Sequence, residues 1–139
     1  MIKAFDHVAI PIQKVDEMIA FYQALGCEVS DDFGKRLYSI HFGDNKINFH
    51  TPAIWQSGKF SLRGPSAQPG CGDFCFVWGD SEKALLQRLE PLKVEIEEGP
   101  VERLGGRNGG LDSGSSIYIR DPDNNLLEFI IYPCEAAAD

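Results

Sequence analysis

Clustered positive charge is missing from this sequence. Its 139 residues include 13 Lys and Arg against 21 Asp and Glu, for a formal net charge of -8. Nucleic-acid-binding proteins need clustered basic residues, so no nucleic-acid partner is expected. The chain also lacks a run of about 18 apolar residues, and we expect no membrane contact. Its opening, MIKAFDHVAI, lacks the apolar region and cleavage site of a signal peptide, so we expect a cytoplasmic protein.

Cysteine pairs of the metal-binding kind are also missing. The four cysteines, Cys27, Cys71, Cys75 and Cys134, form no CxxC motif, so a structural zinc knuckle is not expected. Disulfides are not expected in a reducing compartment. Cys27 and Cys75 lie in apolar stretches, which predicts that both are small core residues.

What is present is the composition of a globular protein, with 43% hydrophobic and 24% charged residues. Period-two alternation and helical spacing predict strand, helix and three strands in the first half. The expected strands cover residues 5–12, 27–30, 35–42 and 46–50, and the expected helix, from Val15 to Leu25, ends at Gly26. Residues 51–70 are rich in Ser, Gly and Pro, which predicts a linker or a long surface loop.

The same order of elements returns in the second half. The expected strands cover residues 73–78, 94–97, 115–120 and 125–132. A helix carrying Leu85, Leu89 and Leu92 is expected to follow a cap at Asp80 or Ser81. The strand at 94–97 is expected to end before Gly99-Pro100, and Gly105 to Gly114 is expected to be a flexible loop.

The chain therefore reads as two copies of one βαβββ unit. A four-stranded sheet with one helix buries only the face that the helix covers, so two copies side by side can curve their other faces around a cleft. We predict an α+β fold in which two such modules form a curved, cup-like mixed sheet with the helices outside. The expected organisation is a single domain, 1–139, with module one at 1–50, a linker at 51–72, module two at 73–132 and a tail at 133–139.

Four potential metal ligands fall on the first and last strands of these modules. His7 and Asp73 lie on the two first strands, and His50 and Glu128 lie on the two last strands. Alternation turns His7 away from Val8, and it turns Glu128 away from Leu127. All four could then face the cleft, and a shared cation would explain why an acid interrupts the apolar stretch LLEFI.

Five motifs resemble the vicinal oxygen chelate superfamily, which includes glyoxalase I, bleomycin-resistance proteins and extradiol dioxygenases. They are DHVAI, FYQALG, FGDNKINFH, EGPVER and IYIRDPDNNLLEF, and together they span nearly the whole chain. The last is the most specific, and the chain is most similar to small glyoxalase-domain proteins, some of them virulence-associated. The resemblance implies paired βαβββ modules around a divalent metal, with His7, His50, Asp73 and Glu128 as ligands.

The resemblance also implies chemistry. It implies a metal-dependent, lactoylglutathione lyase-type enzyme with a small-molecule substrate, in which Glu128 is both ligand and general base. The metal would be Zn, Ni, Co, Mn or Fe(II), and relatives commonly form homodimers. In glyoxalase I a His usually stands at the position of Asp73, and an acid or amide at the position of His50, so imidazole and carboxylate are exchanged here. An epimerase, a thiol transferase, a dioxygenase and a non-catalytic binding or resistance protein stay open as alternatives.

Overall fold

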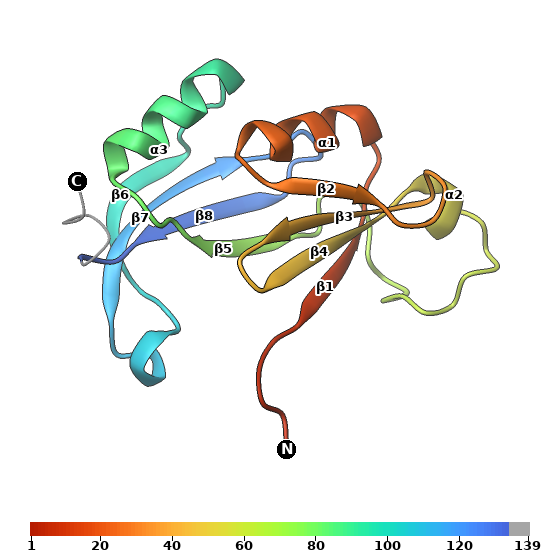
Figure 1. Ribbon diagram of the computed structural model, residues 1–139, viewed down its shortest axis with the longest axis horizontal. Helices are drawn as coiled ribbons and strands as arrows, with labels where there is room; N and C mark the ends of the chain where they lie inside the picture. Colours follow the sequence, from red (N-terminus) through yellow and green to blue (C-terminus); the bar gives the residue numbers. More distant parts are fainter. Residues whose placement is uncertain (134–139) are drawn as a thin grey trace. The chain divides into compact units, whose positions relative to one another are not determined.

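The computed structural model describes residues 1–133, so Cys134 and all but the first residue of the predicted tail lie outside the described residues. The chain divides into two compact units. Unit 1 comprises Met1–Gly72 and Pro122–Asn124, and unit 2 comprises Asp73–Asp121 and the residues from Asn125 onward. Each unit has its own four-stranded sheet (Figure 1).

Unit 1 has the predicted order of strand, helix and three strands, followed by one extra helical turn. Its elements are β1 (His7–Pro11), α1 (Val15–Ala24), β2 (Glu28–Asp31), β3 (Leu37–Phe42), β4 (Asn45–His50) and α2 (Pro52–Trp55). The strands lie in the order β1-β4-β3-β2, with β1 parallel to β4 and the other pairs antiparallel. The buried side of α1 packs against one face of this sheet and leaves the other face without a helix.

The core of unit 1 forms between α1 and that covered face. Met18 and Tyr22 of α1 are fully buried, as are Ile47 and Phe49 of β4. The rings of Tyr22 and Phe49 meet edge to face, with their centroids 5.4 Å apart. Gly26 has a φ of 99° directly after the helix, the left-handed conformation that commonly ends a helix, so the predicted stop is confirmed.

Unit 2 repeats the same plan. Its elements are β5 (Asp73–Val77), α3 (Glu82–Leu89), η1 (Glu90–Leu92), β6 (Glu98–Leu104), η2 (Arg107–Gly110), β7 (Ser113–Arg120) and β8 (Leu126–Ile131). The strand order is β5-β8-β7-β6, with β5 parallel to β8. Ser81 caps α3, because its Oγ accepts a hydrogen bond from the N–H of Ala84 at 3.1 Å. The α+β fold with two βαβββ units is confirmed.

One strand prediction is wrong. Residues 94–97 are not in a strand, and β6 begins only at Glu98 and contains Gly99-Pro100. Proline cannot donate to a sheet ladder, so the sequence suggested a break there. In the structure β6 is the edge strand, and its register with β7 shifts between Glu98 and Val101. An edge strand with such an irregularity tolerates proline.

Two smaller expectations also change. Leu92 belongs to the short 3₁₀ turn η1 and not to α3. Cys75 is exposed, because Phe74 and Phe76 take the core-facing positions of β5 and alternation turns Cys75 outward. The predicted linker is a structured loop that contains α2, and its Trp55 donates from Nε1 to the carbonyl of Ile12 at 2.9 Å.

Candidate metal and substrate site

The open face of the unit 1 sheet carries both predicted histidine ligands. In the parallel pair β1–β4, His7 lies opposite Lys46, Ala9 opposite Asn48, and Pro11 opposite His50. Residues paired in this way point to the same side of a sheet. His7, Asn48 and His50 therefore share the face opposite the buried Ile47 and Phe49. The side chain of His7 is 44% exposed, and its Nδ1 lies 2.6 Å from the Asp6 carboxylate.

The open face of unit 2 carries the other two predicted ligands. In the parallel pair β5–β8, Asp73 lies opposite Leu126 and Cys75 opposite Glu128. Asp73, Cys75 and Glu128 therefore share one face, and Leu127 and Phe129 are buried on the other. Glu128 interrupts an apolar stretch because it points away from the core.

The two strand pairs show which positions correspond between the units. Glu128 lies two residues beyond the partner of Asp73, and the matching position in unit 1 lies two residues beyond Lys46, the partner of His7. That position is Asn48. His50 lies two residues further on, about 7 Å along the strand at 3.3 Å per residue. His50, the ligand predicted on the last strand of module one, therefore lies two residues beyond the position that corresponds to Glu128.

Glu128 lies in a ring of hydrogen-bonding side chains that sequence reasoning missed. The buried Ser116 on β7 donates from Oγ to Oε2 of Glu128 at 2.6 Å. Tyr118 lies directly opposite Glu128 in register, and Arg103 on β6 donates from Nε to the Tyr118 hydroxyl at 3.1 Å. Burial is the main cause that raises the pKa of Tyr118, and Glu128 raises it further while Arg103 lowers it. These residues are recognised by their pairing with β8, and the sequence alone does not specify that pairing.

Cys75 is the fourth member of this ring. Although Cys75 is exposed as a residue, burial of its thiol, followed by the charge of the Glu128 carboxylate and a hydrogen bond to it, raises the pKa of Cys75 to about 12. The thiol therefore stays protonated at neutral pH and acts as a donor toward Glu128. Ser116, Tyr118 and Cys75 thus surround the carboxylate from three neighbouring positions.

A second polar network covers the open face of unit 1 around Asn48. The fully buried Ser39 contacts the Asp32 carboxylate, accepts from Lys46 Nζ at 3.3 Å, and lies 3.0 Å from Oδ1 of Asn48. The hydrogen bond from Ser39 is the main cause that lowers the pKa of Asp32. His41 has a structural partner, since its Nε2 lies 2.8 Å from the hydroxyl of Ser30.

His50 has a different environment from the other three predicted ligands. It is only 5% exposed, and its ring meets the ring of Phe60 edge to face at 5.4 Å. Burial lowers the pKa of His50, and the charge of Arg63 lowers it further. His50 also lies four residues along the strands from the level of His7, about 13 Å.

Comparison with known proteins settles the family. A family model described as "Glyoxalase/Bleomycin resistance protein/Dioxygenase superfamily" matches residues 4–129. The chain belongs to this superfamily. It is 39% identical over 132 residues to the glyoxalase domain-containing protein RDO1 of Mycosarcoma maydis, covering 94% of this chain and 69% of that protein.

Two solved structures extend the comparison. The virulence protein STM3117 of Salmonella typhimurium is 30% identical over 132 residues, and its crystal structure superposes with a TM-score of 0.80 over 95% of this chain and 98% of that one. The fosfomycin resistance protein FosX of Listeria monocytogenes, solved with Mn(II) and 1S,2S-dihydroxypropylphosphonic acid, is 21% identical with a TM-score of 0.62 over 98% and 96% of the two chains. FosX shares the superfamily fold.

A divalent metal needs several donor atoms gathered at one point. Within residues 1–133, no three His, Cys, Asp or Glu side chains lie together as a metal-binding group. Unit 1 offers the imidazole of His7 and the amide of Asn48, and unit 2 offers the carboxylates of Asp73 and Glu128. Taken by unit, an imidazole with an amide oxygen and a pair of carboxylates are donor types that suit ions such as Mn(II) or Fe(II). His50 fits this set poorly, because about 13 Å along the strands separates it from His7.

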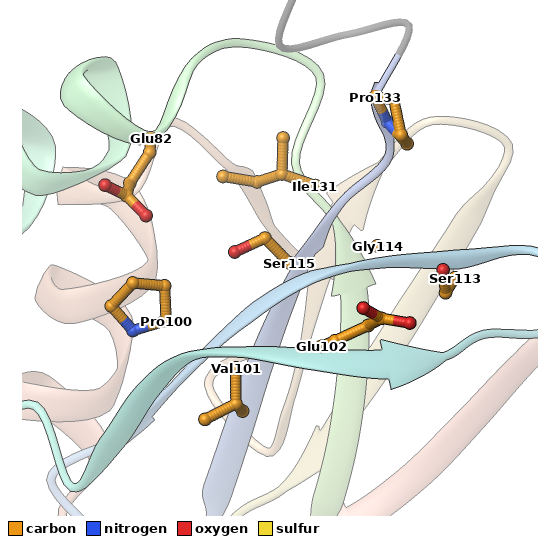
Figure 2. A pocket seen from close by; sticks show the side chains of 9 residues that line it. All are labelled: Glu82, Pro100, Val101, Glu102, Ser113, Gly114, Ser115, Ile131 and Pro133. Atoms are coloured by element: carbon orange, nitrogen blue, oxygen red, sulfur yellow. The ribbon is translucent and has the colours of Figure 1, made fainter.

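A cavity of about 480 Å³ lies in unit 2 (Figure 2). Its lining comes from α3, β6, β7, β8 and the residue after them: Glu82, Pro100, Val101, Glu102, Ser113, Gly114, Ser115, Ile131 and Pro133. Ser115 pairs with Ile131 on the same face as the buried Ile117, which is the helix-covered face. The cavity and the Glu128 ring therefore lie on opposite faces of the sheet.

Among the described residues, no helix is long and apolar enough to span a membrane.

Proposed function

We propose that this chain is a metal-dependent enzyme of the glyoxalase type, acting on a small molecule with two adjacent oxygens and moving a proton next to a carbonyl. The observation that carries the proposal is Glu128, a carboxylate on the open face of its sheet, held by Ser116 and surrounded by other donors. Burying a carboxylate without hydrogen-bond donors would cost free energy, and a carboxylate exposed to water would not need these donors. This arrangement is what a fixed, reactive carboxylate requires.

The proposed metal ligands are His7, Asn48, Asp73 and Glu128. His7 with Asn48 and Asp73 with Glu128 hold matching register positions in the two units, which supports a shared role. FosX is a fold relative solved with Mn(II) and a compound that has two adjacent hydroxyl groups. A bound divalent ion would supply Lewis-acid polarisation of substrate oxygens. Mn(II) and Fe(II) are the preferred candidates for this oxygen-rich set, with Zn, Ni and Co to be tested beside them.

Glu128 is proposed to move the proton. Ser116 holds the carboxylate through Oε2, and the carboxylate takes the proton from the carbon beside the carbonyl and returns it to the neighbouring, former carbonyl carbon. Cys75, with its high thiol pKa, stays a neutral donor and does not compete as a base. The buried Ser116 holds the carboxylate in one orientation, which lowers the cost of positioning it for each turnover.

The test of this role is Glu128→Gln. We expect kcat with the hemithioacetal of methylglyoxal and glutathione to fall by about 10²- to 10⁴-fold, the usual contribution of general acid–base catalysis, with an unchanged circular dichroism spectrum. Each of Zn, Ni, Co, Mn and Fe(II) is added back to metal-free protein. Glu95→Gln, an exposed acid of unit 2, is the matched control and should keep full activity. Full activity of Glu128→Gln would refute the catalytic role.

Metal binding is tested separately from turnover. His7→Ala, Asn48→Ala and Asp73→Ala should each lower affinity for the activating metal by more than about 100-fold, since even residues behind metal ligands commonly contribute 10- to 100-fold. His50→Ala should change it little, and a large loss there would instead support the original prediction of His50 as a ligand. Purified protein that binds none of these ions would favour a non-catalytic binding protein.

Of the four proposed ligands, His7 and Asn48 belong to unit 1, and Asp73 and Glu128 belong to unit 2. We propose that the units work as one domain and that the chain is a homodimer, as its resemblance to relatives suggests. Mixing inactive His7→Ala with inactive Glu128→Gln protein distinguishes the arrangements. Restored activity means that each site combines unit 1 of one chain with unit 2 of another, and no restoration means that each chain completes its own.

A further inference from the structure

His50 is a buried polar side chain that the proposed metal site does not use. It is only 5% exposed, and its ring nitrogens have no hydrogen-bond partner within residues 1–133. It points from the same sheet face as His7 and Asn48. Buried polar groups in folded proteins nearly always have partners, so one without a protein partner next to a proposed active site is a candidate for ligand binding.

Arg63 in the loop after α2 is the second group of this kind. Its Nη2 donates to the carbonyl of Ala67 at 2.6 Å, and its guanidinium carbon lies 5.9 Å from the ring centroid of Trp55. Its Nε is shielded from solvent and has no acceptor within the described part of the chain. Arg63 also has no carboxylate partner there, although the chain carries a net charge of -8 and offers 21 acids.

The loop that carries Arg63 is held firmly against unit 1. Trp55 donates from Nε1 to the carbonyl of Ile12 at 2.9 Å, and Thr51 donates from Oγ1 to the carbonyl of Arg36 at 2.7 Å. The rings of Phe60 at His50 and of Trp55 at Arg63 supply apolar walls. Arg63 follows Phe60 by three residues in this loop, and the ring of Phe60 meets the ring of His50. One loop therefore brings aromatic rings against both His50 and Arg63.

We propose that His50 and Arg63 form a subsite that binds an oxyanion of the substrate, either a carboxylate or a phosphate-type group. A guanidinium matches the planar or tetrahedral oxygens of such groups with paired N–H donors, and an imidazole N–H adds another donor. Aromatic walls exclude water and strengthen these hydrogen bonds. No carboxylate of the described chain competes for Arg63.

The subsite also sets a spacing for the substrate. His50 lies two residues beyond Asn48 on β4, about 7 Å along the strand. Insofar as the oxyanion belongs to the substrate, the inference rests on the proposed function. The substrate would carry its adjacent oxygens at the His7–Asn48 end and an anionic group about 7 Å away.

A binding measurement tests the subsite without relying on activity. The full chain is titrated with inorganic phosphate and, separately, with succinate at constant ionic strength, with chloride as the blank and tryptophan fluorescence as the readout. Trp55 lies beside Arg63, so we expect a saturable change that Trp55→Phe abolishes. Arg63→Gln should weaken binding about tenfold or more, and Arg63→Lys should weaken it less, because it keeps the charge. The oxyanion that binds more tightly identifies the preferred class.

The matched control is Arg88→Gln, an exposed arginine on α3 of unit 2, which should bind as the unaltered protein does. Absence of saturable binding by either oxyanion would overturn the subsite, as would unchanged binding by Arg63→Gln that keeps its circular dichroism spectrum. Equal loss in Arg88→Gln would show a general charge effect and would overturn it too.

A kinetic measurement then links the subsite to turnover. Methylglyoxal forms hemithioacetals with glutathione, which carries carboxylates, and with 2-mercaptoethanol, which carries none. Arg63→Gln should raise KM for the glutathione adduct about tenfold with kcat unchanged, and should leave KM for the mercaptoethanol adduct within about twofold. Equal effects on both adducts would refute the assignment. If the unaltered protein turns over neither adduct, the proposed function fails, and the fluorescence titration still decides whether the subsite exists.

Discussion

Replacing Asn125 by alanine should destabilise the turn that leads into β8 and Glu128. Asn125 is fully buried, and its Nδ2 donates to both carboxylate oxygens of Asp121, at 3.1 Å and 2.8 Å. Its backbone N–H donates to the same carboxylate at 2.9 Å. Asp121 is only 5% exposed, so water cannot easily replace the donors that the substitution removes.

The expected loss follows from those contacts. Hydrogen bonds to charged groups contribute about 1.5–3 kcal/mol each, and Asn125→Ala removes two that share one donor while keeping the backbone donor. We therefore expect the free energy of unfolding to fall by about 2–4 kcal/mol. For a chain of this size that corresponds to a fall in Tm of roughly 5–15 °C.

Urea unfolding followed by circular dichroism measures this loss. The midpoint should fall with an unchanged m value, because the substitution changes stability and not the surface exposed on unfolding. Gln87→Ala removes an exposed amide from α3 and is the matched control, expected to change stability by less than about 0.5 kcal/mol. A loss below about 1 kcal/mol for Asn125→Ala would refute the reasoning that the amide sustains a buried carboxylate.

Three further predictions follow from individual groups. Burial and the charge of Arg63 lower the pKa of His50 below its ordinary 6.5, so the unfolded chain binds a proton at His50 before the folded chain does, and stability is lost as the pH falls below about 7. In urea unfolding at pH 7 and pH 5, His50→Gln should therefore lose less stability between the two pH values than the unaltered protein. An equal loss in both proteins would contradict this. Because the pKa of Cys75 is raised to about 12, iodoacetamide at pH 8 should modify Cys75 much more slowly than the exposed Cys71, and Glu128→Gln should speed the reaction of Cys75. Both cysteines lie on the tryptic peptide 64–83, so tandem mass spectrometry locates the modified one, and equal rates at the two cysteines would disprove this. Ser81→Ala removes the cap of α3 and should lower the free energy of unfolding, measured in urea, by about 1 kcal/mol. Ser81→Asp keeps a capping oxygen and should retain most of that stability. An equal loss in both variants would argue against capping.

Element order was predictable because it depends on local patterns. Alternation with period two marks strands such as β4, and helical spacing marks α1, whose end at Gly26 needs only a residue that tolerates positive φ. The strand predicted at 94–97 failed because the position of β6 depends on being at the edge of the sheet, where Pro100 needs no ladder partner.

The candidate site was only half predictable for a similar reason. Alternation showed that His7 and Glu128 turn away from the core, and residue type marked them as possible ligands. Neither alternation nor residue type could show which residue of β4 pairs with His7. That register made Asn48 the counterpart of Glu128 and separated His50 from it by two residues.

The repeated βαβββ order, and the side of each strand that faces the core, follow from local patterns, because both depend on neighbours a few residues apart in the chain. Which side chains meet follows from the folded arrangement of distant segments. Ser116 and Tyr118 reach Glu128 through pairing between strands, and the ring of Phe60 meets that of His50 through a folded loop. Such contacts depend on strand register and loop path, which no local pattern of residues specifies.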